Sequence, residues 1–191
     1  HSESVPVRRV RSSGAEDSRD MLAVEEPREI RLIRGSGNAR NNKPVSVTMR
    51  TPGNDNELAA GFLFTENIIH NADDILSVKA GLGTEGNSVV VELDPGTQPV
   101  LQGLERNFYT TSSCGVCGKT SVDAVRLTSS FSAAGSKLSV SSALLNSLPE
   151  KLKGHQKVFD VTGGLHASTL FDAQGELLLV REDVGRHNAL D

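Results

Sequence analysis

Apolar and polar residues alternate along two stretches in the first half of the chain, residues 29–34 and 44–50. Alternation with a period of two is typical of strands that bury one face. A turn-rich loop separates the stretches, so we expect an antiparallel hairpin. Residues 56–67 then carry apolar side chains at helical spacing. Two more apolar runs, residues 75–79 and 88–93, flank a glycine-rich turn and predict two further strands.

The predicted helix begins after Thr-Pro-Gly-Asn-Asp, residues 51–55, which is typical of a break followed by a helix start. We expect Asn54 or Asp55 to cap the helix by accepting from its first backbone N–H groups. Glu57 is an acid of the kind that a helix N-terminus favours. The small residues 59–61 should allow another segment to pack closely against the helix.

The second half alternates between helical and strand patterns. A pair of serines precedes a helical pattern over residues 143–152, which Pro149 should bend or interrupt. Residues 165–171 and 176–181 read as strands joined by the turn Asp-Ala-Gln-Gly, which predicts a second hairpin. Residues 182–191 look like the end of a strand leading into the start of a helix.

These patterns predict a mixed α/β protein in three parts. Residues 1–20 are rich in serine, arginine and acids and read as a flexible tail. Residues 21–100 form a small β-rich part with one helix. Residues 101–191 begin a larger α/β domain that we expect to be incomplete at its C-terminus, because a helix starting at the last residues has nothing to pack against.

Composition narrows the class of protein. The chain has 191 residues, 37% of them hydrophobic, and a net charge of −4, which favours a globular protein over a nucleic-acid binder. It has no tryptophan and a single tyrosine, so a stacking platform for single strands is not expected. No apolar run approaches the roughly 20 residues of a membrane span. Two cysteines do not make a secreted disulfide framework, so we expect a reducing cytoplasm.

Both cysteines, Cys114 and Cys117, lie in one stretch of small residues. Gly115 and Gly118 give the backbone freedom, and Lys119 favours a thiolate. Such a thiolate can accept and hand on a sulfur atom as a persulfide. The same pair could instead act as a redox dithiol. It could also supply half of a zinc site. Three histidines could in principle complete that site: His155, His166 and His187. Spacing alone leaves the three chemistries open.

A second candidate site lies at the end of the chain. Arg186 could fork onto a phosphate or carboxylate, His187 could shuttle a proton, and Asn188 stands beside them. Gly163 and Gly164 could let a backbone approach a phosphate, although they match no nucleotide-binding motif. For both groups a plain polar turn is the competing interpretation.

Six blocks together resemble one family, the formate dehydrogenase accessory sulfurtransferases or FdhD family. They include the cysteine loop Thr-Thr-Ser-Ser-Cys-Gly-Val-Cys-Gly and the final Asp-Val-Gly-Arg-His-Asn-Ala-Leu-Asp. Their order is that of the family, from about residue 21 to the end. The blocks are residues 23–27, 49–53, 57–63, 108–118, 160–167 and 181–191.

The resemblance implies a sulfurtransferase that works as a sulfur carrier. Family members take sulfur as a persulfide from a cysteine desulfurase and pass it to the molybdenum of the bis-guanylated molybdopterin cofactor, which formate dehydrogenase then receives. Carried over, Cys114 bears the persulfide and Cys117 is its partner in transfer. The alternative is a cofactor-binding or chaperone module whose cysteines ligate a metal.

The resemblance also implies a fold and an assembly. The larger domain should be a mixed sheet like that of cytidine deaminases, and the protein should be a homodimer. The chain lacks the His-x-Glu of the deaminase zinc signature, so we expect no permanent metal. Family members continue past the last block, and we infer that Arg186, His187, Asn188, Gly163 and Gly164 contribute to the remaining cofactor site.

Overall fold

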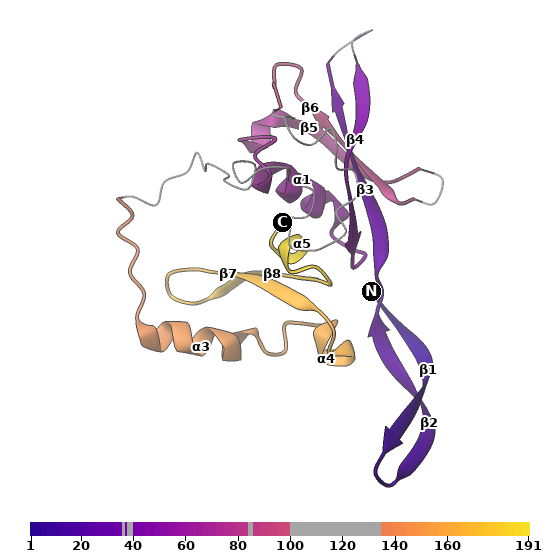
Figure 1. Cartoon of the computed structure of the whole chain (residues 1–191). Helices are drawn as coiled ribbons and strands as arrows, with labels where there is room; N and C mark the ends of the chain where they lie inside the picture. The colour runs from indigo at the N-terminus through magenta and orange to yellow at the C-terminus, as the bar shows by residue number, and fades with distance from the viewer. Residues whose placement is uncertain (36, 38–39, 84–85, 100–134) are drawn as a thin grey trace, which may run out of the picture.

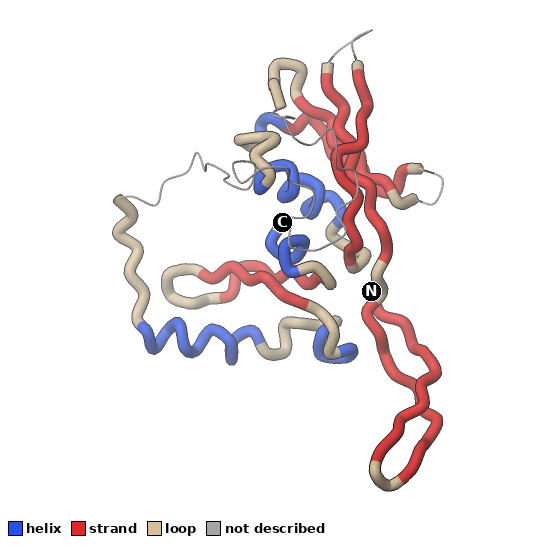
Figure 2. Tube along the Cα trace, viewed as in Figure 1, coloured by secondary structure: helices blue, strands red, loops and turns tan. Residues whose placement is uncertain are grey.

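The computed structural model describes residues 1–35, 37, 40–83, 86–99 and 135–191. Strands dominate it, with five helical segments among them (Figures 1 and 2). The first half holds β1 (Ser2–Arg11), β2 (Gly14–Ala23), β3 (Glu26–Arg34), β4 (Asn41–Arg50), α1 (Asp55–Thr65), the 3₁₀ helix η2 (Ala72–Asp74), β5 (Ile75–Leu82) and β6 (Ser88–Leu93). The second half holds α3 (Ser142–Leu152), α4 (Phe159–Thr162), β7 (His166–Phe171), β8 (Leu177–Asp183) and α5 (Arg186–Leu190).

Four strands form a mixed sheet in the order β4–β3–β6–β5. The β3–β4 and β5–β6 pairs are antiparallel, which confirms the four strands and the hairpin expected from the alternation. The central pair β3–β6 is parallel. A parallel pair needs a long crossover, and here the connection from β3 to β6 includes β4, α1 and β5. The pattern of single strands does not reveal that pairing.

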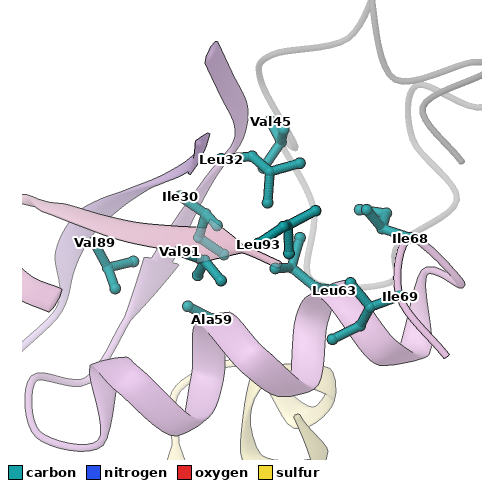
Figure 3. Packing of buried hydrophobic residues seen from close by; sticks show 10 residues of the cluster. All are labelled: Ile30, Leu32, Val45, Ala59, Leu63, Ile68, Ile69, Val89, Val91 and Leu93. Carbon is teal, nitrogen blue, oxygen red and sulfur yellow. The ribbon is translucent and has the colours of Figure 1, made fainter. Parts of the chain in front are cut away.

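Helix α1 packs on one face of this sheet and encloses the main core (Figure 3). Alternate residues of β6 are buried, so the expected period of two holds. Leu63 of α1 is fully buried, with 0% of its surface exposed, and fully burying such a side chain contributes about 1.5–3 kcal/mol. The cluster comprises Ile30, Leu32, Val45, Ala59, Leu63, Ile68, Ile69, Val89, Val91 and Leu93.

A buried charge network joins the sheet to the start of α1. Arg28 and Arg50 are 4% and 2% exposed. Asp55 accepts from Arg28 through both oxygens, at 3.1 and 2.8 Å, and from Nε of Arg50 at 2.7 Å. Arg50 also reaches Glu26 at 3.0 Å, and Arg28 donates to the carbonyl of Gly86 at 2.6 Å. Burial, and then the charge of Arg50, lower the pKa of Arg28.

This network changes the role expected for Asp55. Neither Asn54 nor Asp55 caps α1 with its side chain, since the N-cap residue Asn54 makes no side-chain cap hydrogen bond. The carboxylate of Asp55 instead compensates two buried guanidinium groups. A buried cation without a partner costs far more free energy than a helix start without a side-chain cap. The carboxylate of Asp55 therefore lies beside the two arginines and not at the first N–H groups of the helix.

Residues 1–20 are not a tail in the structure, and the expectation for them was wrong. Strands β1 and β2 pair along their whole length, from Ser2 opposite Ala23 to Arg11 opposite Gly14, and form a ribbon that extends away from the sheet (Figure 1). Opposite charges lie across it, directly opposed at Arg8 and Asp17, 4.0 Å apart, and diagonally at Arg11 and Glu16, 3.2 Å apart. Cross-strand pairs of this kind support a hairpin. Polar residues on both faces hid the strand period.

The second half follows its sequence pattern closely. Strands β7 and β8 pair antiparallel, and the carboxylate of Asp172 in their turn accepts from the backbone of Gln174 at 2.9 Å. Ser141 caps α3 by accepting from Leu144 N at 3.1 Å. Pro149 does not interrupt the helix, because α3 runs through it to Leu152.

Among the described residues, no helix is long and apolar enough to cross a membrane. The predicted boundary near residue 100 stays a prediction, because residues 100–134 lie outside the described part of the chain.

The buried network leads to a prediction about stability. Asp55→Asn should lower the free energy of unfolding by about 3–5 kcal/mol, because it removes the carboxylate that compensates two buried cations. Urea unfolding followed by circular dichroism measures this difference. Asp73→Asn, an exposed acid in η2, is the matched control and should change stability by less than about 0.5 kcal/mol. Equal stability of the two variants would contradict the role given to Asp55.

Candidate functional site

The cysteines expected to carry the chemistry, Cys114 and Cys117, lie outside the described residues. Their role therefore stays a prediction. The site that can be described is a cavity of about 610 Å³ between α1 and the β7–β8 hairpin. Its walls come from residues 51–61 before and in α1, from both strands of the hairpin, and from residues 188–191 in and directly after α5. In Figure 1, α5 lies between α1 and the hairpin.

A buried carboxylate, Asp183, holds one corner of this cavity together. It is 5% exposed and accepts from Thr51 N at 2.9 Å, Gly185 N at 2.7 Å and Asn188 Nδ2 at 3.0 Å. The side-chain Oγ1 of Thr51 in turn accepts a hydrogen bond from Val184 N at 3.2 Å. Burial raises the pKa of Asp183, and the three donors oppose that rise. The corner therefore ties the end of β4 to the turn between β8 and α5.

Asn188 belongs to the same corner. Besides Asp183, its Nδ2 donates to the carbonyl of Met49 at 2.8 Å, and its Oδ1 accepts from Thr48 Oγ1 at 3.3 Å. Both ends of the amide are thus engaged by the protein. Asn188 lines the cavity, but in this arrangement it positions α5 on β4 rather than offering free groups to a ligand.

The other predicted cofactor residues are placed differently. Arg186 and His187 are exposed at the start of α5, next to Asn188. Gly163 takes a left-handed conformation, φ 67°, and its N–H donates to Phe159 O at 2.7 Å, which is a common helix C-cap. Neither Gly163 nor Gly164 is among the described residues that line the cavity.

Histidines that could complete a zinc site are not assembled with other ligands in the described part of the chain. No group of three or more histidine, cysteine, aspartate or glutamate residues is placed there to hold a metal ion. Cys114 and Cys117 are outside that search, so the finding concerns His155, His166 and His187 without them.

An ion pair crosses the cavity from α1 to β8. Both Nε and Nη2 of Arg181 donate to the carboxylate of Glu57, the second contact at 2.8 Å. The hydrogen bond from Arg181 lowers the pKa of Glu57, and the same bond raises the pKa of Arg181. The two residues are 124 positions apart, and sequence alone suggested only that Glu57 is a helix N-terminal acid. Their presence in two of the resemblance blocks was the available signal.

Gly61 explains how α5 fits against α1. A Cβ atom built on Gly61 would lie 1.8 Å from the backbone oxygen of Asp191, so only glycine, which has no side chain, fits at this position. The expected close packing at residues 59–61 is therefore confirmed, and its partner is Asp191, directly after α5. The expectation that the last helix has nothing to pack against was wrong, because α5 contacts α1, β7 and β8. Burial raises the pKa of Asp191 to about 6, against the hydrogen bond that Thr65 donates to it.

Comparisons with known proteins point to one family. A model of the FdhD/NarQ family matches residues 38–191. The chain is 52% identical over 178 residues to a sulfur carrier protein FdhD of Mycolicibacterium paratuberculosis, covering 90% of this chain and 62% of the relative. It is 47% identical over 190 residues to a sulfur carrier protein FdhD of Streptomyces avermitilis, covering 96% and 64%. The chain thus spans less than two thirds of the length of these curated relatives.

A solved structure supports the fold. The chain resembles a formate dehydrogenase accessory protein from Desulfotalea psychrophila with a TM-score of 0.68 at 21% identity, over 99% of this chain and 65% of the other. At this low sequence identity the match supports a conclusion about the fold only. The structural similarity confirms the mixed α/β architecture.

The corner at Asp183 generates a prediction. Asp183→Asn replaces an acceptor oxygen by an amide that faces backbone N–H donors, which should cost about 1–3 kcal/mol. Urea unfolding measures the loss. Hydrogen exchange should show faster exchange at the amides of Thr51 and Gly185, which lose their acceptor. Asp160→Asn, an exposed acid in α4, is the control. Unchanged protection of both amides in Asp183→Asn would rule out the corner described here.

Proposed function

The chain belongs to the FdhD/NarQ family, and from this premise we propose that it is a sulfur carrier acting as a sulfurtransferase. The observation that carries the proposal is the match to curated relatives named sulfur carrier protein FdhD, which extends over 90–96% of this chain at 47–52% identity. The matched length is too great for a shared motif alone. Formate dehydrogenase is proposed to be the enzyme that receives the sulfurated cofactor.

The chemistry is assigned to the cysteine loop. Cys114 attacks the outer sulfur of a persulfide on a cysteine desulfurase, a new S–S bond forms on Cys114, and the donor cysteine leaves as a thiolate. This exchange needs no external oxidant or reductant. Attack requires the thiolate form, which neighbouring Lys119 favours. Cys117 is the second thiol, placed to assist transfer or to resolve the persulfide.

The acceptor is proposed to be the molybdenum of the bis-guanylated molybdopterin, bound as a substrate rather than as a resident cofactor. Exposed Arg186 supports this, because a guanidinium forks well onto phosphate, and exposed His187 lies beside it. Arg186 and His187 are not among the described residues that line the cavity, but their neighbour Asn188 is, and the volume of about 610 Å³ lies within the range of small-molecule sites. Gly163 and Gly164 remain weaker candidates, since their described role is a helix cap.

Three further features belong to the same proposal. A cysteine desulfurase is the sulfur donor, the assembly is a homodimer, and the protein works in the cytoplasm. The larger domain is proposed to have a sheet like that of cytidine deaminases. The hairpin β7–β8 followed by α5 is compatible with such a domain and supplies part of its strands.

Incubation with a cysteine desulfurase and cysteine tests the sulfur-carrier role. Intact mass should rise by one sulfur atom and return to its starting value after reduction. Cys114→Ala should abolish the adduct, because it removes the accepting thiol, whereas Cys117→Ala should still load sulfur on Cys114. Ser113→Ala keeps both thiols in the same loop and is the matched control, which should load like the wild type.

A different result would favour the alternative function. If the wild type forms no reducible adduct but contains near-stoichiometric zinc that either cysteine substitution removes, the cysteines ligate a metal. Metal analysis of the same three variants therefore separates a carrier from a metal-binding module.

A further inference from the structure

The β1–β2 ribbon is the least covered part of the described chain. Its two strands pair only with each other, and no residue of either strand is buried. A two-stranded ribbon is at best marginally stable by itself in water, because it needs a third strand or a packed helix. Helix α4 contacts β2 beside the end of the strand that is nearest the sheet (Figure 1). The rest of the ribbon has two free edges.

The register shows which backbone groups point to these edges. Val24 N donates to His1 O at 2.9 Å, which makes residues 1 and 24 a hydrogen-bonded pair. Such pairs alternate with non-hydrogen-bonded pairs along antiparallel strands. Since Ser2 lies opposite Ala23, the even-numbered residues of β1 and the odd-numbered residues of β2 turn their N–H and C=O groups outward.

The outer edge of β1 is blocked at two successive outward positions. Pro6 has no N–H to donate, and a proline on an edge hinders the addition of a strand. The guanidinium of Arg19 reaches across the ribbon to Ser4, where Nε donates to Oγ at 2.9 Å and Nη2 to the outward carbonyl at 2.7 Å. A further strand cannot form a continuous ladder with this edge.

The outer edge of β2 is open between the tip of the ribbon and Met21. It contains no proline, and its outward groups belong to Ala15, Asp17 and Arg19. Within the described part of the chain, these three residues make no backbone hydrogen bond outside the ribbon. Met21 N is the next outward donor and already binds the carboxylate of Asp20 at 3.0 Å, so the open stretch ends there.

This open edge is acidic. Strand β2 carries Glu16, Asp17 and Asp20, while its one cation, Arg19, is held by Ser4 across the ribbon. Arginines of β1 pair with the three acids at 3.2 to 4.0 Å. An added strand, however, would lie about 4.8 Å from β2 and about twice as far from β1, close to the screening length of about 10 Å at 0.1 M salt. Its side chains therefore meet the acids first and should be basic.

A second copy of this chain fits the edge poorly. Two copies related by a two-fold axis join their β2 strands antiparallel, with odd-numbered residues opposite odd-numbered ones. The registers of longest overlap place like charges opposite each other: Asp17 and itself, Arg19 and itself, Asp20 and itself, or Glu16 and Asp20. Like charges directly opposite are destabilising. In the last register Asp17 also faces Arg19, but that guanidinium is already engaged across the ribbon.

We propose that the outer edge of β2 is a docking site for an extended basic segment of another protein, which adds to the ribbon as a third, antiparallel strand. Ala15, Asp17 and Arg19 supply the backbone ladder, and Glu16, Asp17 and Asp20 select lysine or arginine opposite them. The third strand also supplies the pairing that a two-stranded ribbon lacks. Docking at this edge does not depend on the proposed function, because it involves neither the cysteines nor the cavity.

The sequence of β1 provides a probe for this edge. A peptide of residues 2–11 in the register of β1 would place its two adjacent arginines opposite Asp17 and Glu16, but its proline opposite Arg19. Pro6→Thr in the peptide restores the missing N–H. The threonine peptide should bind the purified chain about fivefold or more tightly than the proline peptide, because it makes one more ladder hydrogen bond. Fluorescence anisotropy of labelled peptides measures both affinities, and raised salt should weaken binding.

Hydrogen exchange followed by NMR locates the bound peptide. The amides of Asp17 and Arg19 should exchange about tenfold more slowly with the threonine peptide bound, because their N–H groups gain acceptors. The amides of Glu16 and Ser18 already face β1, and the amide of Arg8 faces the other edge, so these three should change little. Protection at Arg8 instead of Asp17 would place the peptide on β1 and overturn the proposal.

Variants of the chain separate the two edges. Asp17→Pro removes an outward N–H from β2 and should weaken binding of the threonine peptide about tenfold, whereas Asp17→Asn removes the charge alone and should weaken it about threefold. Val10→Pro is the matched control, because it removes an outward N–H from β1 and should leave binding unchanged. Equal weakening by the two proline substitutions would contradict the assignment to β2.

Other results would also overturn the proposal. Equal affinity of the two peptides would exclude strand addition, and this comparison needs no variant of the chain. Absence of binding by the threonine peptide up to about 1 mM would exclude the site. Sedimentation velocity tests the remaining occupant: a dimer that Asp17→Pro dissociates and Val10→Pro does not would assign the edge to a second copy.

Discussion

The carboxylate of Asp55, which binds two buried arginines, is the contact on which the placement of α1 depends. It compensates Arg28 from β3 and Arg50 from β4 at distances of 2.7–3.1 Å, so the first turn of the helix is tied to two strands at once. Apolar burial is non-directional and would let α1 slide along the sheet. Charge pairing is directional, and leaving either arginine alone would be costly. The network therefore determines where α1 begins.

The chain then uses the next few residues to place the cavity. Thr51 follows Arg50 directly and binds Asp183, while Glu57 comes two positions after Asp55 and binds Arg181. The segment that anchors α1 to the sheet is thus the segment that holds the β7–β8 hairpin and α5. Gly61 completes the contact by letting the end of α5 reach the helix backbone. One short stretch, residues 50–61, therefore determines both the position of α1 on the sheet and the place of the cavity.

Local patterns predicted most elements, and the misses have a physical cause. Strands β3 to β8 and helix α3 follow from periods of 2 and 3.6 residues, because burial of one face imposes those periods. Helices α1 and α5 were expected also from the signals that mark a helix start after a break or a strand. The β1–β2 ribbon has no buried face and was missed. The sequence predicts a cap at Asn54 or Asp55 and not the charge pairing of Asp55, because the arginines that Asp55 binds are 5 and 27 residues away. The Glu57–Arg181 pair and the parallel β3–β6 pairing depend on tertiary contacts that no local window contains.

The resemblance blocks carry more spatial information than their order along the chain suggests. Residues 49–53, 57–63 and 181–191 are widely separated in sequence, yet each contributes side chains to the same cavity or to the corner that supports it. Two of these blocks, residues 49–53 and 181–191, contribute no side chain to the sheet core of Figure 3, whereas residues 57–63 contribute Ala59 and Leu63 to it. Their convergence on polar contacts instead indicates that the pattern describes a site. The cavity, rather than the core, is therefore the place where these three blocks meet.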